Sequence, residues 1–226
     1  MPTPSWRRSV GEIPAADCDF LYRSLVAFSL FVCETPEGGH PQEAKEAIRS
    51  CFALLGESVP TSEIAMAVHR GYVAALTDSA PLDPTSIFPR FRQLAGHDDK
   101  AALLHLMSYS AAAGFGFNLG RARRFIYVCE GIGMSDKEAA AFLSRLIGFD
   151  LHGDSPGSTF PPFIVEALGL LGIKRDASAT QIDAAAQQKA APLREDYASW
   201  DGEAHTPATL RVTQILDARR VLLAFA

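Results

Sequence analysis

The sequence predicts an all-α protein, and two observations support this prediction. From Asp17 onward, apolar residues recur with the three- and four-residue spacing of amphipathic helices. The alternation of apolar and polar residues that is typical of a half-buried strand is not found. With 226 residues, 48% of them hydrophobic, the chain is long enough to bury a core. We therefore expect helices packed on helices, in one large or two small domains.

The first expected helix is central to the core. Residues 1–16 contain three prolines and no periodic pattern, so they predict an irregular arm. The run from Phe20 to Cys33 that follows is apolar on more than one face and should be covered on most sides. Its inward positions are expected to be Leu21, Leu25, Phe28 and Val32.

Three more helices are expected before residue 96. Pro41 suits the first turn of a helix that ends at Gly56 and whose buried face holds Ala44, Ile48, Cys51 and Leu55. The next should begin near Thr61 and bury Ile64, Val68, Tyr72 and Leu76. The third opens with Asp83 as N-cap and Pro84 at the first helical position, and its inward residues are Ile87, Phe88, Phe91 and Leu94.

Start signals also mark the helices of the middle region. Asp98 or Asp99 can cap a helix from Ala101 to about Ala113. Another helix should span Leu119 to Gly131. A capping box from Ser135 to Glu138 opens the last helix of this region, with Phe142, Leu143, Leu146 and Ile147 directed inward.

The turn-rich segment 151–162 predicts a linker between two helical blocks, residues 17–150 and residues 163–226. The C-terminal block should hold three helices. The first runs from Phe163 to Leu171, and the second opens with a capping box from Ser178 to Gln181. The third opens at Thr206-Pro207 and should bury Leu210, Ile215, Ala218 and Leu222.

Composition excludes several classes of function. The net charge of -5 comes from mixed acids and bases without a basic run, so we expect no nucleic-acid binding. The apolar run from Phe20 to Cys33 contains Arg23 and is too short to cross a bilayer, so we expect no membrane insertion. The N-terminus lacks the apolar core of a signal peptide, and the four cysteines are scattered. A cytoplasmic protein is expected.

Motifs for catalysis or cofactor binding are also missing, so we expect no enzyme and no cofactor. The glycines at 114, 116 and 120 have the wrong spacing for a dinucleotide fingerprint and follow a helix. Cys129 lies at a helix end without a nearby histidine in the sequence, which favours a packed thiol over a nucleophile. No serine lies in a Gly-x-Ser-x-Gly elbow.

Residues 17–150 contain two related patterns. The first is Glu37-Gly38 followed by Glu43, and the second is the set Phe125, Ile126, Val128, Ile132, Gly133, Met134 and Ser135 after a second turn. By these residues the region resembles the TerB-like domain of tellurite-resistance proteins. The resemblance implies a helical fold built from two similar units whose acids bind a divalent metal. The second turn, residues 114–120, has no acid. Because hard cations need several oxygen ligands, we expect no metal here.

A divalent-metal-binding stress protein is the alternative hypothesis. In that case Glu37, Glu43 and the intervening His40 would supply ligands. The competing interpretation is a polar turn followed by a helix whose first turn favours negative charge.

Residues 163–226 combine the turn from Leu171 to Ser178 with Ile182, Ala185, Ile215, Ala218 and Leu222. By these residues the region resembles a DnaJ-type J-domain. A TerB-like region followed by a J-domain is the order of DjlA-like co-chaperones. In that family a His-Pro-Asp tripeptide after the second helix stimulates a DnaK-type chaperone. Alignment from Ile182 places Arg194, Glu195 and Asp196 at those positions, so only the acid is left.

The second helix of the module also departs from the family pattern. J-domains keep a basic second helix, whereas this one has Lys189 and Arg194 opposed by Asp183 and Glu195. Pro192 should end or bend the helix just before the altered tripeptide. We therefore expect no stimulation of a DnaK-type ATPase.

The expected function is that of a protein-binding adaptor or assembly factor without catalysis. Interface anchors tend to be aromatic or arginine, which makes Trp6 and Arg7 in the N-terminal arm candidates. A disordered arm is the competing interpretation. The first candidate is the segment after the second C-terminal helix, with Arg194, Glu195, Asp196, Tyr197 and Trp200. Phe115 and Phe117 could be exposed or could fold back onto the core.

Overall fold

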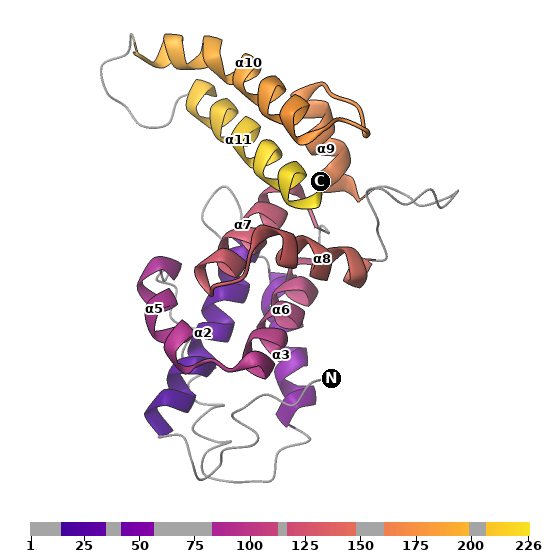
Figure 1. Cartoon of the computed structure of the whole chain (residues 1–226). Helices are drawn as coiled ribbons and strands as arrows, with labels where there is room; N and C mark the ends of the chain where they lie inside the picture. Colours follow the sequence, from indigo (N-terminus) through magenta and orange to yellow (C-terminus); the bar gives the residue numbers. More distant parts are fainter. Residues whose placement is uncertain (1–14, 35–41, 57–82, 113–116, 148–160, 199–206) are drawn as a thin grey trace. The chain divides into compact units, whose positions relative to one another are not determined.

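A computed structural model of the chain describes residues 15–34, 42–56, 83–112, 117–147, 161–198 and 207–226 (Figure 1). Within these ranges the secondary structure is helical and contains no strand, which confirms the all-α prediction. None of the helices in these ranges is both long and apolar enough to cross a membrane.

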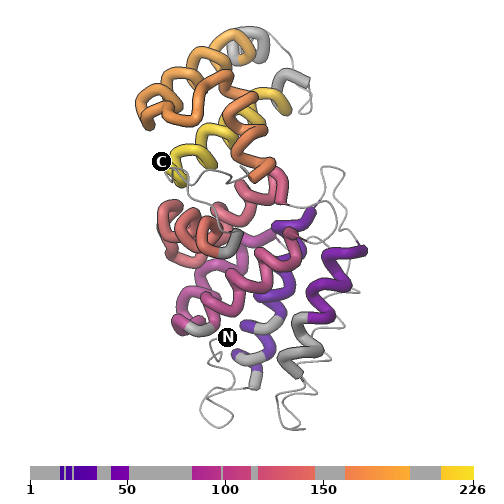
Figure 2. Tube along the Cα trace, turned by 90° about the vertical axis from the view of Figure 1, so that its right-hand side faces the viewer, coloured from indigo at the N-terminus to yellow at the C-terminus, as the bar shows by residue number. Residues whose placement is uncertain are grey.

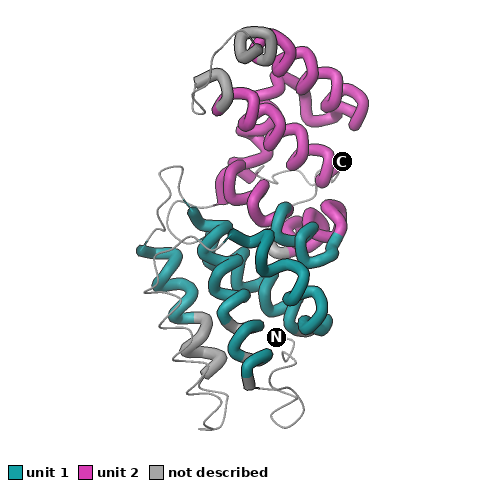
Figure 3. Tube along the Cα trace, turned by 90° about the vertical axis from the view of Figure 1, so that its left-hand side faces the viewer, with its two compact units in different colours: residues 1–116, 127–134 teal, residues 117–126, 135–226 magenta. Residues whose placement is uncertain are grey.

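The chain divides into two compact units, shown in Figure 3. Unit 1 comprises residues 1–116 and 127–134, and unit 2 comprises residues 117–126 and 135–226. Helix α7 (Leu119–Gly131) therefore contributes to both units. Most of the predicted linker, residues 151–160, lies outside the described residues, so the predicted domain boundaries stay a prediction.

Unit 1 is built around α2 (Ala15–Cys33). This helix packs against α3 (Gln42–Gly56), α5 (Pro84–Leu94) and α6 (His97–Ala112), as Figures 1 and 2 show. The four predicted inward residues of α2 are buried, and so are Ala44 and Ile48 of α3. The predicted central role of this helix is thereby confirmed. The helix predicted from Thr61 lies outside the described residues.

Aromatic rings and one arginine fix α5 against its neighbours. The ring of Phe28 stacks on that of Phe88 at 5.4 Å and meets Phe91 edge-on at 5.3 Å. Phe88 in turn contacts Tyr127 of α7. The guanidinium of Arg90 lies 4.4 Å from the centre of the Phe20 ring and pairs with Asp17 at 2.8 Å. A hydrophobic contact and an ion pair thus hold α5 on α2.

The predicted starts of α5, α7 and α8 (Asp136–Ile147) are confirmed, and that of α6 is wrong. Asp83 caps α5 by accepting from the Thr85 N–H at 3.0 Å. Ser135 and Glu138 form the predicted capping box of α8. Helix α6, however, begins at His97 and not at Ala101. Asp99 lies in its first turn and accepts from the Gly96 N–H at 2.8 Å, so it bonds backward and does not precede the helix.

Unit 2 contains the three predicted C-terminal helices, α9 (Pro162–Leu171), α10 (Ala179–Ala198) and α11 (Pro207–Phe225). We call them the three-helix module. Helix α11 packs against α8, α9 and α10. Buried side chains from the three helices form its centre: Phe163, Ile164, Ala167, Leu171, Ile182, Ala186, Ala190, Ile215, Ala218, Val221 and Leu222. The capping box at Ser178 and Gln181 is confirmed.

The prediction for Leu210 of the module is wrong, and so is one of the two alternatives predicted for Pro192. Leu210 was expected in the core but is 59% exposed. A helix turns about 100° per residue, so Leu210 points roughly 140° away from Ile215, five positions later. Pro192 was expected to end or bend α10; it does not end the helix, which continues to Ala198, and the bend stays a prediction. Pro192 is exposed, and helix α10 does not end there.

Candidate interaction site on the C-terminal unit

The sequence-predicted interface residues are only partly within the described ranges. Trp6, Arg7 and Trp200 lie outside them. Arg194, Glu195, Asp196 and Tyr197 belong to the last turns of α10, where the backbone is described and the side chains are not. The position of the altered tripeptide is therefore helical, whereas the J-domain resemblance places it after the second helix.

The alternative metal site is also only partly described. Glu37 and His40 lie outside the described residues, while Glu43 is exposed in the first turn of α3. Among the side chains that the structure describes, no three His, Cys, Asp or Glu gather in a way that could hold a metal ion. Cys129 is fully buried, as the packed-thiol interpretation expects, and so is Cys33.

Lys189 is the only basic side chain described on α10, and it forms a hydrogen bond inside the module. Its ammonium group donates to the Leu170 carbonyl at 2.8 Å, close to the end of α9. That end is closed by Gly172, which has a left-handed backbone with φ of 67°. The Ile173 N–H bonds to the Leu168 carbonyl and the Gly172 N–H to that of Gly169, which is a Schellman motif. Lys189 therefore satisfies a further terminal carbonyl of α9.

Asp183, the acidic side chain described on the same helix, also forms its contact within the module. Asp183 of α10 forms an ion pair with Arg219 of α11, with 2.6 Å between oxygen and nitrogen. Each side chain is about two-fifths exposed. The pair joins α10 to α11 at the rim of their contact, and Lys189 joins α10 to α9.

A row of aromatic rings joins the module to the rest of unit 2. Phe117 contacts Phe125 of α7 at 6.1 Å and Phe163 of α9 at 5.5 Å. Phe125 stacks on Phe142 of α8, and Phe163 contacts Phe225 of α11. Phe117, whose exposure the sequence leaves open, therefore folds back and forms the central link of this aromatic row. Phe115 lies outside the described residues.

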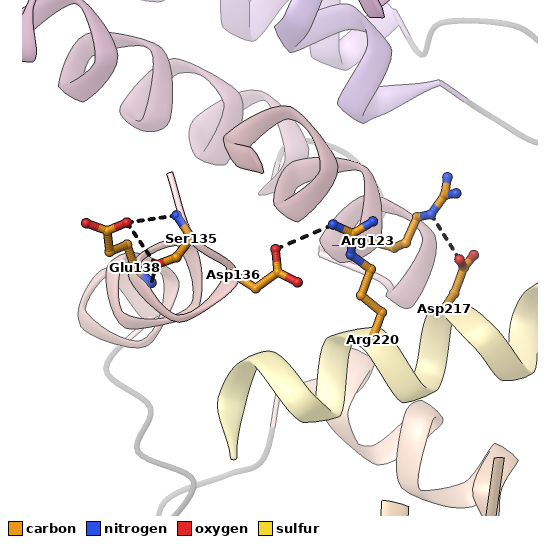
Figure 4. A network of polar contacts seen from close by, with 6 residues as sticks. All are labelled: Arg123, Ser135, Asp136, Glu138, Asp217 and Arg220. Carbon is orange, nitrogen blue, oxygen red and sulfur yellow. Dashed lines mark hydrogen bonds and ion pairs between the residues drawn. The ribbon is translucent and has the colours of Figure 1, made fainter. Parts of the chain in front are cut away.

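Polar contacts accompany the aromatic row, as Figure 4 shows in part. The Leu119 N–H at the start of α7 donates to the Glu166 carboxylate of α9 at 3.3 Å. Arg123 of α7 pairs with Asp217 of α11 at 2.9 Å. Arg220 pairs with Asp136, the first residue of α8, at 3.4 Å. Helices α7 and α8 thus each form an ion pair with α11.

The surroundings of Asp217 disfavour the charged form of its carboxyl group. Burial raises the pKa of its carboxyl group above the ordinary value, although the neighbouring Arg123, Arg124 and Arg220 act to lower it. Its side chain is 19% exposed. The loss of water around the carboxylate therefore outweighs the attraction of three arginines.

Three large apolar side chains remain exposed on the described part of the module. In the described part of the module, Val165 of α9 and Leu210 and Leu216 of α11 are large apolar residues that remain exposed, at 55%, 59% and 40%. Sequence reasoning did not single out Val165 or Leu216. Val165 directly follows the apolar residues Phe163 and Ile164, and within so short a run periodicity does not separate inward from outward positions.

Comparison with known proteins gave no match. No protein-family model, curated protein or solved structure matches the chain.

Proposed function

We propose that this protein is a non-catalytic adaptor or assembly factor of the cytoplasm, in which a TerB-like domain and a degenerate J-domain-like module bind other proteins. One observation carries the proposal. The described charged side chains of α10 that could guide a chaperone to the module are committed internally, Lys189 to the α9 carbonyl and Asp183 to Arg219. The Asp183–Arg219 pair cancels its own charge, and the Lys189 ammonium is held toward the end of α9, so the described part of α10 presents little of the positive face that would steer a chaperone to it.

Further support comes from the position of the altered tripeptide. Arg194, Glu195 and Asp196 replace the family's His-Pro-Asp and belong to helix α10. The retained three-helix packing, together with the exposed Val165 and Leu216, suits recognition of a protein partner.

A chaperone assay tests the loss of the ancestral activity. The full chain is added to a DnaK-type chaperone, and steady-state ATP hydrolysis is measured beside an active J-protein. We expect no rise above the chaperone alone. A rise comparable to that of the active J-protein would overturn the proposal.

Site-specific photo-crosslinking tests the adaptor role. A photoreactive residue at Val165, Leu210 or Leu216 in the full chain should capture a discrete partner in the native cell. The matched control is the same group at Gln93, an exposed position of α5 in unit 1. Equal capture from Gln93 would show that the module is not the binding surface.

Calorimetry with calcium, magnesium and zinc tests the metal-binding alternative, for which we expect a flat titration.

A further inference from the structure

The helices of unit 2 carry an excess of positive charge, although the net charge of the whole chain is -5. Among the side chains of unit 2 that the structure describes, eleven are Lys or Arg and six are Asp or Glu, which gives a net charge of +5. The rest of the chain holds the other ten basic and twenty acidic residues. The fold therefore separates charges that the sequence mixes.

Four basic residues come from the region where α7, α8 and α11 meet, and we call them the basic cluster: Arg123, Arg124, Lys137 and Arg220. Asp217 pairs with Arg123 at 2.9 Å, and Arg124 also attracts its carboxylate. Asp136 pairs with Arg220 at 3.4 Å, and Lys137 is exposed directly after it. Four cations and two carboxylates leave a net charge of +2 at this place.

The positive side chains of the cluster lie toward the solvent. In the pair of Arg123 and Asp217, the arginine side chain is 35% exposed and the aspartate only 19%. Glu138, the other acid in this part of α8, bonds to Ser135 and points away from Arg220 in Figure 4. An approaching ligand therefore meets positive charge before it meets the Asp217 carboxylate.

We propose that the basic cluster binds an acidic segment of the partner protein. This inference rests on the proposed adaptor function and names the chemistry of its partner. Guanidinium groups bind carboxylates through two parallel N–H bonds. The cluster holds two carboxylates of its own chain, so its arginines are placed to receive groups of this kind. Complementary charge gives such a contact its specificity.

A short acidic segment fits the cluster better than a nucleic acid does. Charges separated by more than about 8 Å are largely screened at physiological salt, so a short peptide responds to the cluster alone. A longer polyanion would also approach the rest of the chain, whose ten basic and twenty acidic residues repel it.

Fluorescence anisotropy of the full chain with a short, fluorescein-labelled oligoglutamate peptide tests the site at about 0.15 M salt. We expect saturable binding, although chain and peptide are both acidic. Arg124→Gln and Lys137→Glu should each raise the dissociation constant roughly twofold to fivefold, as expected for exposed ion pairs. Lys137→Glu lies in the first turn of α8, where negative charge is tolerated, so it decides if Arg124→Gln fails to fold.

Arg145→Glu is the matched control, because it makes the same charge reversal on the same helix about 12 Å further along, beyond the screening distance. It should leave the dissociation constant unchanged. Equal weakening by Arg145→Glu would reduce the effect to net charge and refute the site. Absence of peptide binding, or tighter binding of an oligonucleotide of the same charge, would refute it as well.

Two further outcomes separate this site from its alternatives. Peptide binding that appears only after Asp201→Asn and Glu203→Gln would show that the chain's own acidic segment occupies the cluster, which contradicts the proposal. If the peptide fails to bind while photo-crosslinking from Leu216 captures a partner, the acidic-segment site is wrong and the adaptor function stands. If the peptide and its variants behave as expected while no partner is captured, the site stands and the adaptor function fails.

Discussion

Alanine at Gly131 should destabilise unit 1, since the site has no room for a methyl group. A Cβ atom there would lie 2.2 Å from Cζ and 2.4 Å from Cε1 and Cε2 of Phe88, whereas real Cβ atoms keep at least 3.0 Å. The ring would have to retreat by about 0.8 Å. It is 7% exposed and is held between Phe28 and Tyr127, so retreat forces neighbouring rings to shift.

Overpacking of this kind costs about 1–3 kcal/mol, and the better helix propensity of alanine offsets about 1 kcal/mol of it. We therefore expect Gly131→Ala to lower the free energy of unfolding by up to about 2 kcal/mol in urea titrations. Gly169→Ala is the control, because that helical glycine has no neighbouring atom within 4 Å of its Cβ position. It should stabilise by up to about 1 kcal/mol.

A double-mutant cycle identifies the cause of the Gly131 effect. In the background Phe88→Leu, which removes the ring atoms nearest to the added methyl group, Gly131→Ala should lose most of its cost. The reasoning would be refuted if Gly131→Ala were as stable as Gly169→Ala, or if its cost were the same with leucine at position 88.

Three further substitutions test other contacts by thermal or urea unfolding. Ser135→Ala removes half of the α8 capping box and should cost about 1 kcal/mol, while Ser135→Asp should retain most of the stability; equal loss in both would contradict a capping role. Phe117→Ala should cost about 2–3 kcal/mol because two ring contacts disappear, and a change below about 0.5 kcal/mol would show that the aromatic row carries little stability. Lys189→Met keeps the aliphatic stem but loses the bond to the Leu170 carbonyl, for an expected loss of about 0.5–1.5 kcal/mol; an unchanged transition midpoint would argue that water replaces the amine.

Features that depend on neighbouring residues in the sequence could be predicted well. The caps at Asp83, Ser135 and Ser178 each involve a side chain and a backbone group two or three residues away. The inward face of α2 also follows from spacing alone, because four residues of one helix are enough to define an apolar face. Both kinds of information are local, and the structure confirms them.

Contacts between distant segments could not be predicted. The approach of Asp217 to Arg123 depends on how α11 meets α7, and helical periodicity does not contain that information. The same holds for Phe117, whose environment is supplied by Phe125 and Phe163. The error at Leu210 has another origin, since its spacing from Ile215 already places it off the buried face.

The aromatic row has a consequence for the kinetics of folding. Phe163 contacts Phe117, which comes long before it in the chain, and Phe225, which comes long after it. Helical proteins with mostly local contacts fold fast, whereas each distant contact first requires closure of a long loop. Unit 2 should therefore fold more slowly than its helix content suggests, with ring contacts at Phe163 formed late. In stopped-flow experiments, Phe163→Leu should then accelerate unfolding more than it slows refolding.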